Sequence, residues 1–207
     1  MEIILHKNID LSQRHKEELN KAVQDLANSK CSFDYTTPDL ILTDTMGAIP
    51  GCGLYRYPNS IYIIPDECAK RNYSDYRWRV NRTLHGVIIH EYGHHFERML
   101  YDEDILTESN IKNIFKPKND ITNYSDVNYK ENFAESFRVY ITNPELLKAI
   151  NKEKYNFFQK LIKTENDGKL EQWIETFTGT IRYQLETTNT NKHIRTYMKE
   201  NNIDYKR

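Results

Sequence analysis

The sequence contains no long hydrophobic run, and none of its apolar stretches approaches the roughly 20 residues that a membrane-spanning helix requires. Its first residues also lack a basic segment followed by a long apolar stretch, so they do not resemble a secretory signal. These two absences predict a cytoplasmic protein with no membrane partner.

Neither sign of charge is in excess. The chain has 29 lysines and arginines against 30 aspartates and glutamates, which gives a formal net charge of -1. Proteins that bind nucleic acid usually carry a basic excess, so we expect no nucleic-acid partner. Hydrophobic residues make up 38% of the chain and charged residues 29%, proportions typical of a folded globular protein.

Cysteine is scarce, with Cys31, Cys52 and Cys68 as the only three. An odd number at wide spacing is neither a disulfide framework nor a CxxC metal pair, so we expect free thiols, as in a reducing compartment. Internal repeats and low-complexity linkers are absent as well. The 207 residues therefore predict a single monomeric domain over 1–207, with 165–207 as a peripheral C-terminal extension.

The hydrophobic pattern changes along the chain from strand-like to helical. Short apolar or β-prone segments occur at 2–6, 40–42, 54–57 and 61–64, and the last two flank a Pro-Asn-Ser turn that is typical of a hairpin. In four other segments apolar residues recur every three or four positions. This spacing predicts one helix over about 11–28, before most of the strand-like segments, and three after them, over about 80–100, 129–141 and 144–163, with a loop over about 101–128. The expected fold class is α+β: a small mixed or antiparallel sheet whose edge strand lies over an active-site helix, followed by a mostly helical C-terminal half.

The most informative segment is H-E-Y-G-H at residues 90–94, on the predicted helix 80–100. His90 and His94 are one turn apart on the same helical face, so their imidazoles can converge on one Zn²⁺. Glu91 is rotated by about 100° from His90. It therefore lies beside the metal, where a general base for a metal-activated water is needed.

A catalytic zinc needs a third protein ligand and an open fourth position. The metzincin spacing would require Gly at position 97 and His at position 100, where this chain has Glu97 and Leu100. The alternative is a carboxylate from the predicted helix 129–141, on which Glu131 and Glu135 share one face. Spacing alone does not rank these two, and the one that is not a ligand would orient a ligating histidine.

Two further histidines lie on the same predicted helix. His95 follows His94 directly and is therefore about 100° around the helix from it. His85 lies five residues before His90. We expect neither of them to be a ligand.

The segments H-E-Y-G-H at 90–94 and E-N-F-A-E-S-F at 131–137 together resemble the protease domain of anthrax lethal factor and the bacterial Pro-Pro endopeptidases, which are gluzincins. In that family a motif similar to E-x-F-A-E-x-F follows the zinc helix, and its first glutamate is a metal ligand. The resemblance implies that Glu131 is the third ligand and that Glu135 is the partner of a zinc histidine. It also implies that Tyr124, seven residues before Glu131, stabilises the transition state.

The activity that these residues imply is that of a zinc metalloendopeptidase with one catalytic Zn²⁺. Glu91 would take a proton from the attacking water and deliver it to the leaving amine. A protein or peptide substrate would lie extended along the edge strand as an added strand. The substrate-binding residues expected there are Gly53, Leu54, Tyr55, Arg56 and Tyr57.

Two alternatives stay open. The first is an intracellular regulatory protease that cleaves one specific partner, which the missing secretory signal favours slightly. The second is a zinc-stabilised binding module on a catalytically dead protease fold. Such a module would have no reason to keep the general base, and the presence of Glu91 argues against it. The sequence shows no proline-binding subsite, so we expect no particular substrate sequence.

Overall fold

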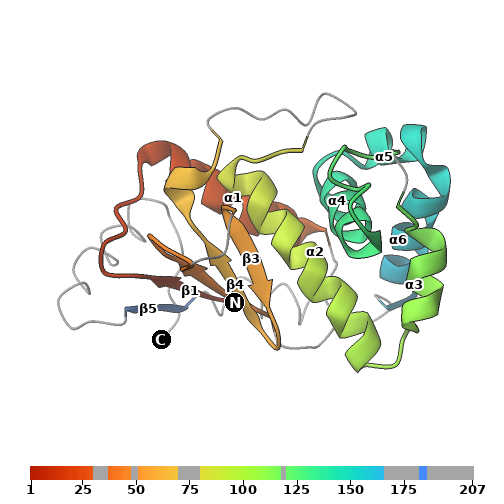
Figure 1. Ribbon diagram of the computed structural model, residues 1–207, viewed down its shortest axis with the longest axis horizontal. Helices are drawn as coiled ribbons and strands as arrows, with labels where there is room; N and C mark the ends of the chain where they lie inside the picture. The colour runs from red at the N-terminus through yellow and green to blue at the C-terminus, as the bar shows by residue number, and fades with distance from the viewer. Residues whose placement is uncertain (30–36, 48–50, 70–79, 118–119, 166–181, 186–207) are drawn as a thin grey trace.

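The computed structural model describes residues 1–29, 37–47, 51–69, 80–117, 120–165 and 182–185. Five short strands form one sheet: β1 (Glu2–Leu5), β2 (Asp39–Leu42), β3 (Gly53–Arg56), β4 (Ser60–Ile63) and β5 (Arg182–Leu185). The described helices are α1 (Gln13–Asn28), α2 (Leu84–Asp102), α3 (Glu108–Ile114), α4 (Tyr129–Thr142), α5 (Pro144–Ile150) and α6 (Lys152–Glu165). Helix α2 crosses the middle of the molecule, with the sheet on one side and α3–α6 on the other (Figure 1). This is the α+β class expected from the sequence.

The sheet is mixed, and its strand order is β3-β4-β2-β1-β5. The pairs β1–β2, β2–β4 and β1–β5 are parallel, whereas β3 pairs with β4 in the antiparallel direction. The register places Leu54 opposite Tyr62 and Arg56 opposite Ser60. The hairpin predicted from the sequence is therefore confirmed, and β3 is an edge strand of the sheet.

Helix α2 is buried on almost every side because it lies between the sheet and α4. It begins at Leu84, four residues later than the periodicity predicts, because Thr83 caps it by accepting a hydrogen bond from the Gly86 N–H. At Gly93 the backbone of α4 comes very close, since a Cβ on this residue would lie 2.9 Å from Ala134 Cα. A glycine here allows the two helices that carry the expected metal ligands to approach each other closely.

Phenylalanine rings form the core of the helical half. Neighbouring centroids within this group lie between 4.7 and 6.3 Å apart, distances at which aromatic pairs attract each other. Each of these rings is at most 1% exposed, and they are Phe96, Phe115, Phe133, Phe137 and Phe158. They connect α2, the end of α3, α4 and α6, so the helices around the expected site are held by one apolar cluster.

Two local expectations are wrong. The helix predicted over 144–163 is split into α5 and α6, because Asn151 has an extended backbone and its side-chain oxygen caps α6 by accepting from the Lys154 N–H. The segment predicted as a loop over 101–128 contains the short helix α3, which begins with a capping box at Thr107 and Asn110. In both places an asparagine side chain bonds to the backbone, and hydrophobic periodicity does not register such bonds.

In the ranges given above, no helix is both long and apolar enough to cross a membrane. Cys52 and Cys68 have free thiols, whereas Cys31 lies outside the described residues. The expected peripheral extension over 165–207 also lies outside them, apart from Glu165 and the four residues of β5, which pair with β1.

Candidate metal centre

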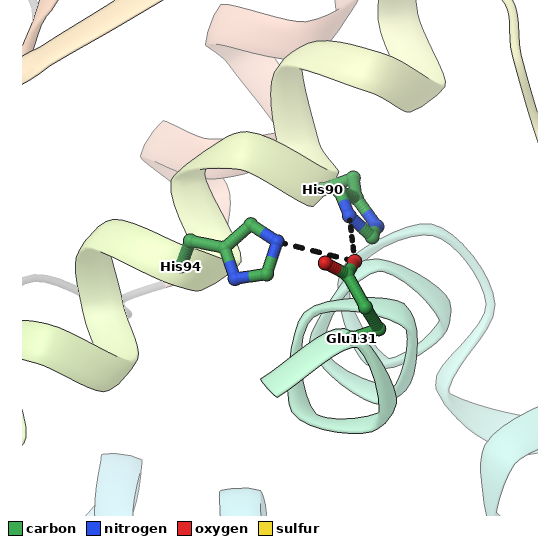
Figure 2. A group of neighbouring side chains, drawn as sticks. All are labelled: His90, His94 and Glu131. Carbon is green, nitrogen blue, oxygen red and sulfur yellow. Dashed lines mark hydrogen bonds and ion pairs between the residues drawn. The ribbon is translucent and has the colours of Figure 1, made fainter. Parts of the chain in front are cut away.

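Helices α2 and α4 bring His90, His94 and Glu131 together, and Figure 2 shows the three side chains converging from the two helices. Glu131 Oε2 lies 3.1 Å from His90 Nε2 and 3.3 Å from His94 Nε2. One ligand atom from each residue lies within 4.8 Å of the other two. In a tetrahedral zinc site with bonds of about 2.0–2.1 Å, donor atoms are about 3.3–3.4 Å apart. Two imidazole nitrogens and one carboxylate oxygen at this spacing fit a divalent transition metal.

The charges in this triad are strongly coupled. Burial lowers the pKa of His90, but hydrogen bonds with Glu131 and Glu135 outweigh burial and raise this pKa to about 10. Burial raises the pKa of Glu131, but hydrogen bonds with His90 and His94 outweigh it and lower this pKa to about 2. Because only neutral imidazole binds a metal, a cation at this position would replace the His90 proton.

Glu135 lies one turn after Glu131, and its side chain is fully buried. Its Oε1 accepts a hydrogen bond from His90 Nδ1 at 2.8 Å, and its Oε2 accepts one from the Thr122 hydroxyl at 2.7 Å. Arg138 donates to the same carboxylate through Nε and Nη2, each at 2.9 Å. Burial raises the pKa of Glu135, but Arg138 and His90 outweigh burial and hold it well below its usual range. An ionised Glu135 fixes the imidazole of His90 with Nε2 facing Glu131.

Glu91 belongs to α2, and its side chain points towards the edge strand β3. Its side chain is buried, and Oε2 accepts a hydrogen bond from the backbone N–H of Tyr55 at 2.7 Å. A Cβ on Gly53 would lie 2.7 Å from Glu91 Oε1 and 2.4 Å from Val87 Cγ1. The absence of a side chain at Gly53 therefore lets β3 lie directly against this carboxylate.

Tyr124 lies in the segment that leads into α4. Its side chain is 38% exposed, and its ring centroid is 5.7 Å from that of His90. Burial, followed by the charges of Glu131 and Glu91, raises the pKa of Tyr124 to about 12. Its hydroxyl group therefore keeps its proton at neutral pH and is able to donate a hydrogen bond.

A cavity of about 930 Å³ opens over these residues. Ligand pockets commonly have volumes of about 300–1,000 Å³. The lining includes Gly53, Leu54, Tyr55, His90, Glu91, His94, Tyr124 and Glu131. Of the expected substrate-binding strand, Arg56 and Tyr57 do not contribute to the lining. Tyr57 is 57% exposed, and the Arg98 guanidinium lies over its ring at 4.6 Å.

The other two histidines of α2 have separate surroundings. His85 Nε2 lies 2.7 Å from Asp25 Oδ2 on α1. The ring of His95 packs against Tyr55 and Tyr92, with centroid distances of 5.6 and 5.5 Å. Neither residue belongs to the group of candidate metal ligands.

Sequence reasoning missed two residues that support this site, Thr122 and Arg138. Arg138 follows Glu135 by three positions on a predicted helix, a spacing at which opposite charges pair, so a signal for this contact was present. Thr122 offers no comparable signal, because its bond to Glu135 joins a loop to a helix across 13 residues.

Comparison with protein-family models and with curated proteins finds no match for the chain. Among solved structures, it is similar to the Pro-Pro endopeptidase PPEP-2 from Paenibacillus alvei. The sequences are 18% identical, the match covers 77% of this chain and 95% of the other, and the TM-score is 0.44. At this level of similarity, the function has to be argued from the geometry of the site itself.

Proposed function

We propose that this chain is a zinc-dependent endopeptidase of the gluzincin type. The metal ligands would be His90, His94 and Glu131, with Glu91 as general base and Tyr124 as the donor that stabilises the transition state. The observation that carries this proposal is that all five side chains line one cavity, which the edge strand β3 borders. A structural metal site would not require a second buried carboxylate and a tyrosine hydroxyl in the same cavity.

The donor set favours a catalytic site over a structural one. Structural zinc sites are usually closed by four protein ligands, whereas catalytic sites have three and leave the fourth position open. Here three candidate ligands converge at the wall of an open cavity. A Zn²⁺ ion held by them would supply the Lewis acid that polarises a peptide carbonyl and lowers the pKa of water.

The protein groups then have distinct roles. Glu91 takes a proton from the attacking water and passes it to the leaving amine, and the Tyr55 N–H holds its carboxylate in position for this step. The Tyr124 hydroxyl donates to the oxygen on which negative charge develops. Removing one such donor typically costs about 3–4 kcal/mol of transition-state stabilisation.

An extended peptide is the substrate that this cavity fits best. Strand β3 pairs with β4 along one edge, and its other edge faces the cavity and Glu91. A peptide that lies along this edge, where no described strand pairs and where only the Tyr55 N–H is bonded to Glu91, gains main-chain hydrogen bonds that do not depend on its sequence. Side-chain preferences would come from the rest of the lining.

Zinc content and peptide cleavage, measured together, test the proposal. Wild type, Glu91→Gln and the control Glu103→Gln, which changes an exposed glutamate just after α2, are purified and incubated with a mixed peptide library. We expect about one equivalent of zinc in all three proteins, as a single three-ligand site requires, and cleavage by wild type and Glu103→Gln only. Folded protein without zinc would overturn the proposal. Zinc without cleavage by wild type would support the alternative of a binding module.

A further inference from the structure

A partly buried polar cluster joins the segment that carries Tyr124 to α4 and α6. Lys154 is 2% exposed, and its Nζ donates to both carboxylate oxygens of Asp120, at 3.0 and 2.8 Å. The same Nζ donates to Asn132 Oδ1 at 2.6 Å, and Asn151 Nδ2 donates to Asp120 Oδ2 at 2.8 Å. Lysine is rarely buried to this extent, and here it is paired with a carboxylate and an amide oxygen.

Lys154 fixes the orientation of the Asn132 carboxamide. An ammonium group only donates, so the branch of the Asn132 carboxamide that faces Lys154 must be Oδ1, which also accepts from the Ser136 hydroxyl at 3.3 Å, and Nδ2 is then the other branch. Nδ2 then donates to the carbonyl oxygen of Ser125 at 3.1 Å, to that of Lys116 at 3.3 Å and, more weakly, to Asp120 Oδ1 at 3.4 Å. The chain of contacts that starts at Lys154 thus ends on the residue next to Tyr124.

The segment around Tyr124 is a tight turn with little freedom of its own. The Ser125 hydroxyl donates to the Thr122 carbonyl at 2.7 Å, and the Ser125 N–H donates to the Thr122 hydroxyl oxygen at 3.2 Å. Thr122 in turn donates to Glu135, which contacts the candidate ligand His90. The turn is therefore hydrogen-bonded through Thr122 to the partner of the candidate ligand His90, and through Ser125 to the cluster around Lys154.

We propose that Lys154 is a positioning residue which, through Asn132 and Ser125, sets the place of the Tyr124 hydroxyl over the metal centre. This inference rests on the proposed function, because it assigns Lys154 a role in the same reaction. Ion pairs contribute little net stability in many proteins, whether exposed or buried, so stability alone is a weak reason for this cluster. The precise placement of a hydrogen-bond donor is a stronger reason for it, since a shift of about 1 Å can lower the reaction rate by about 100-fold.

A double-mutant cycle on the zinc-loaded enzyme tests the proposal. Lys154→Met, Tyr124→Phe and the double variant are compared with wild type for kcat and KM. We expect Lys154→Met to lower kcat by about 10-fold to 100-fold with little change in KM, which is the size expected for a misplaced donor. In the Tyr124→Phe background, the same change should lower kcat by less than about twofold, because sites that act through one another are not additive. Equal losses of kcat in the two backgrounds would overturn the proposal.

Two further variants keep the cycle interpretable. Asn132→Leu keeps the branched shape of the side chain, removes the bond to Ser125 and leaves both members of the Lys154–Asp120 pair present, so it replaces Lys154→Met if that variant does not fold. Lys148→Met removes an exposed lysine on the neighbouring helix α5 and should leave kcat unchanged in both backgrounds.

Hydrogen exchange supplies a readout that does not depend on cleavage. The Ser125 and Val127 N–H groups are bonded within the turn, to Thr122 and Tyr124. In Lys154→Met, the amides of 120–128 should exchange faster, while those of α2 should not change. Unchanged exchange over 120–128 would overturn the positioning role, even if wild type cleaved no peptide and the proposed function had failed.

Discussion

Among the individual residues, Glu91 and Gly53 depend on each other. The Glu91 carboxylate accepts the Tyr55 N–H, and it fits beside β3 because Gly53 has no side chain. A general base must lie within hydrogen-bond reach of the water that it activates, so its place is as important as its pKa. The strand that is proposed to bind the substrate therefore also sets the position of the proposed base.

Gly53→Ala should disturb catalysis without removing the metal. The new Cβ would meet Glu91 Oε1 at 2.7 Å and Val87 Cγ1 at 2.4 Å, so the carboxylate or the strand must move. We expect kcat/KM to fall by about 100-fold, the order of loss that a misplaced catalytic group causes, with zinc content unchanged. Adding Val87→Ala should restore part of the activity. Full activity in Gly53→Ala would show that the base does not act from this position.

At the scale of the elements, the contact between α2 and α4 decides whether the triad forms. Each helix carries only part of it, with two histidines on α2 and Glu131 on α4. The helices lie close together where Gly93 faces the backbone and Cβ of Ala134. The separation of the helices at this point therefore controls the distance between the imidazoles and the carboxylate.

Gly93→Ala should weaken both the fold and the binding of metal. The added Cβ would lie 2.9 Å from Ala134 Cα and 3.3 Å from its Cβ, and overpacking of this kind costs about 1–3 kcal/mol. The better helix propensity of alanine offsets about 1 kcal/mol of this cost. Urea denaturation and zinc competition titrations should show lower stability and lower zinc affinity. Arg98→Ala, on an exposed side chain of α2, should leave zinc affinity unchanged, and equal zinc affinity in Gly93→Ala and wild type would contradict the argument.

At the scale of the whole molecule, the candidate metal centre lies where α2, the helix next to the sheet, meets α4 of the helical half (Figure 1). A ligand that binds only the folded state stabilises it by mass action, so zinc should stabilise the fold that brings α2 and α4 together. In the absence of metal, the ion pairs of His90 with Glu131 and Glu135 hold these helices together instead. Protonation and metal binding therefore compete for the same histidine.

This competition predicts opposite pH dependences with and without zinc. The pKa of His90 is raised from 6.5 to about 10, so its contribution to stability is complete below pH 6.5 and is lost as the pH rises towards 10. Zinc needs the neutral imidazole, so its apparent affinity should rise over the same interval. Thermal melts in EDTA and in excess zinc should separate progressively between about pH 6.5 and 9, a window inside that titration. Glu131→Gln should reduce this separation, and parallel curves for wild type would contradict the prediction.

Local periodicity was sufficient to predict the elements that carry the site. The helical repeat places His90 and His94 on one face, and the β-prone segments on either side of the Pro-Asn-Ser turn predict the β3–β4 hairpin, which the structure contains. These patterns are determined within a few residues of the chain. The break at Asn151 escaped prediction because it depends on the side-chain bonds of one asparagine and not on apolar spacing.

The sequence by itself determined which side chains are available for metal binding and catalysis. They are two histidines and a glutamate in H-E-x-x-H spacing, and two glutamates one turn apart on a later helix. Spacing alone did not say which of Glu131 and Glu135 is the metal ligand, because residues at i and i+4 share one helical face and the spacing does not show what that face contacts. The tertiary structure decided that Glu131 meets both imidazoles while Glu135 meets the far side of one. It also placed Gly53 against Glu91, and Lys154 behind the turn of Tyr124. Such contacts join segments 22 to 45 residues apart, and they depend on how helices and strands pack, which no local pattern encodes.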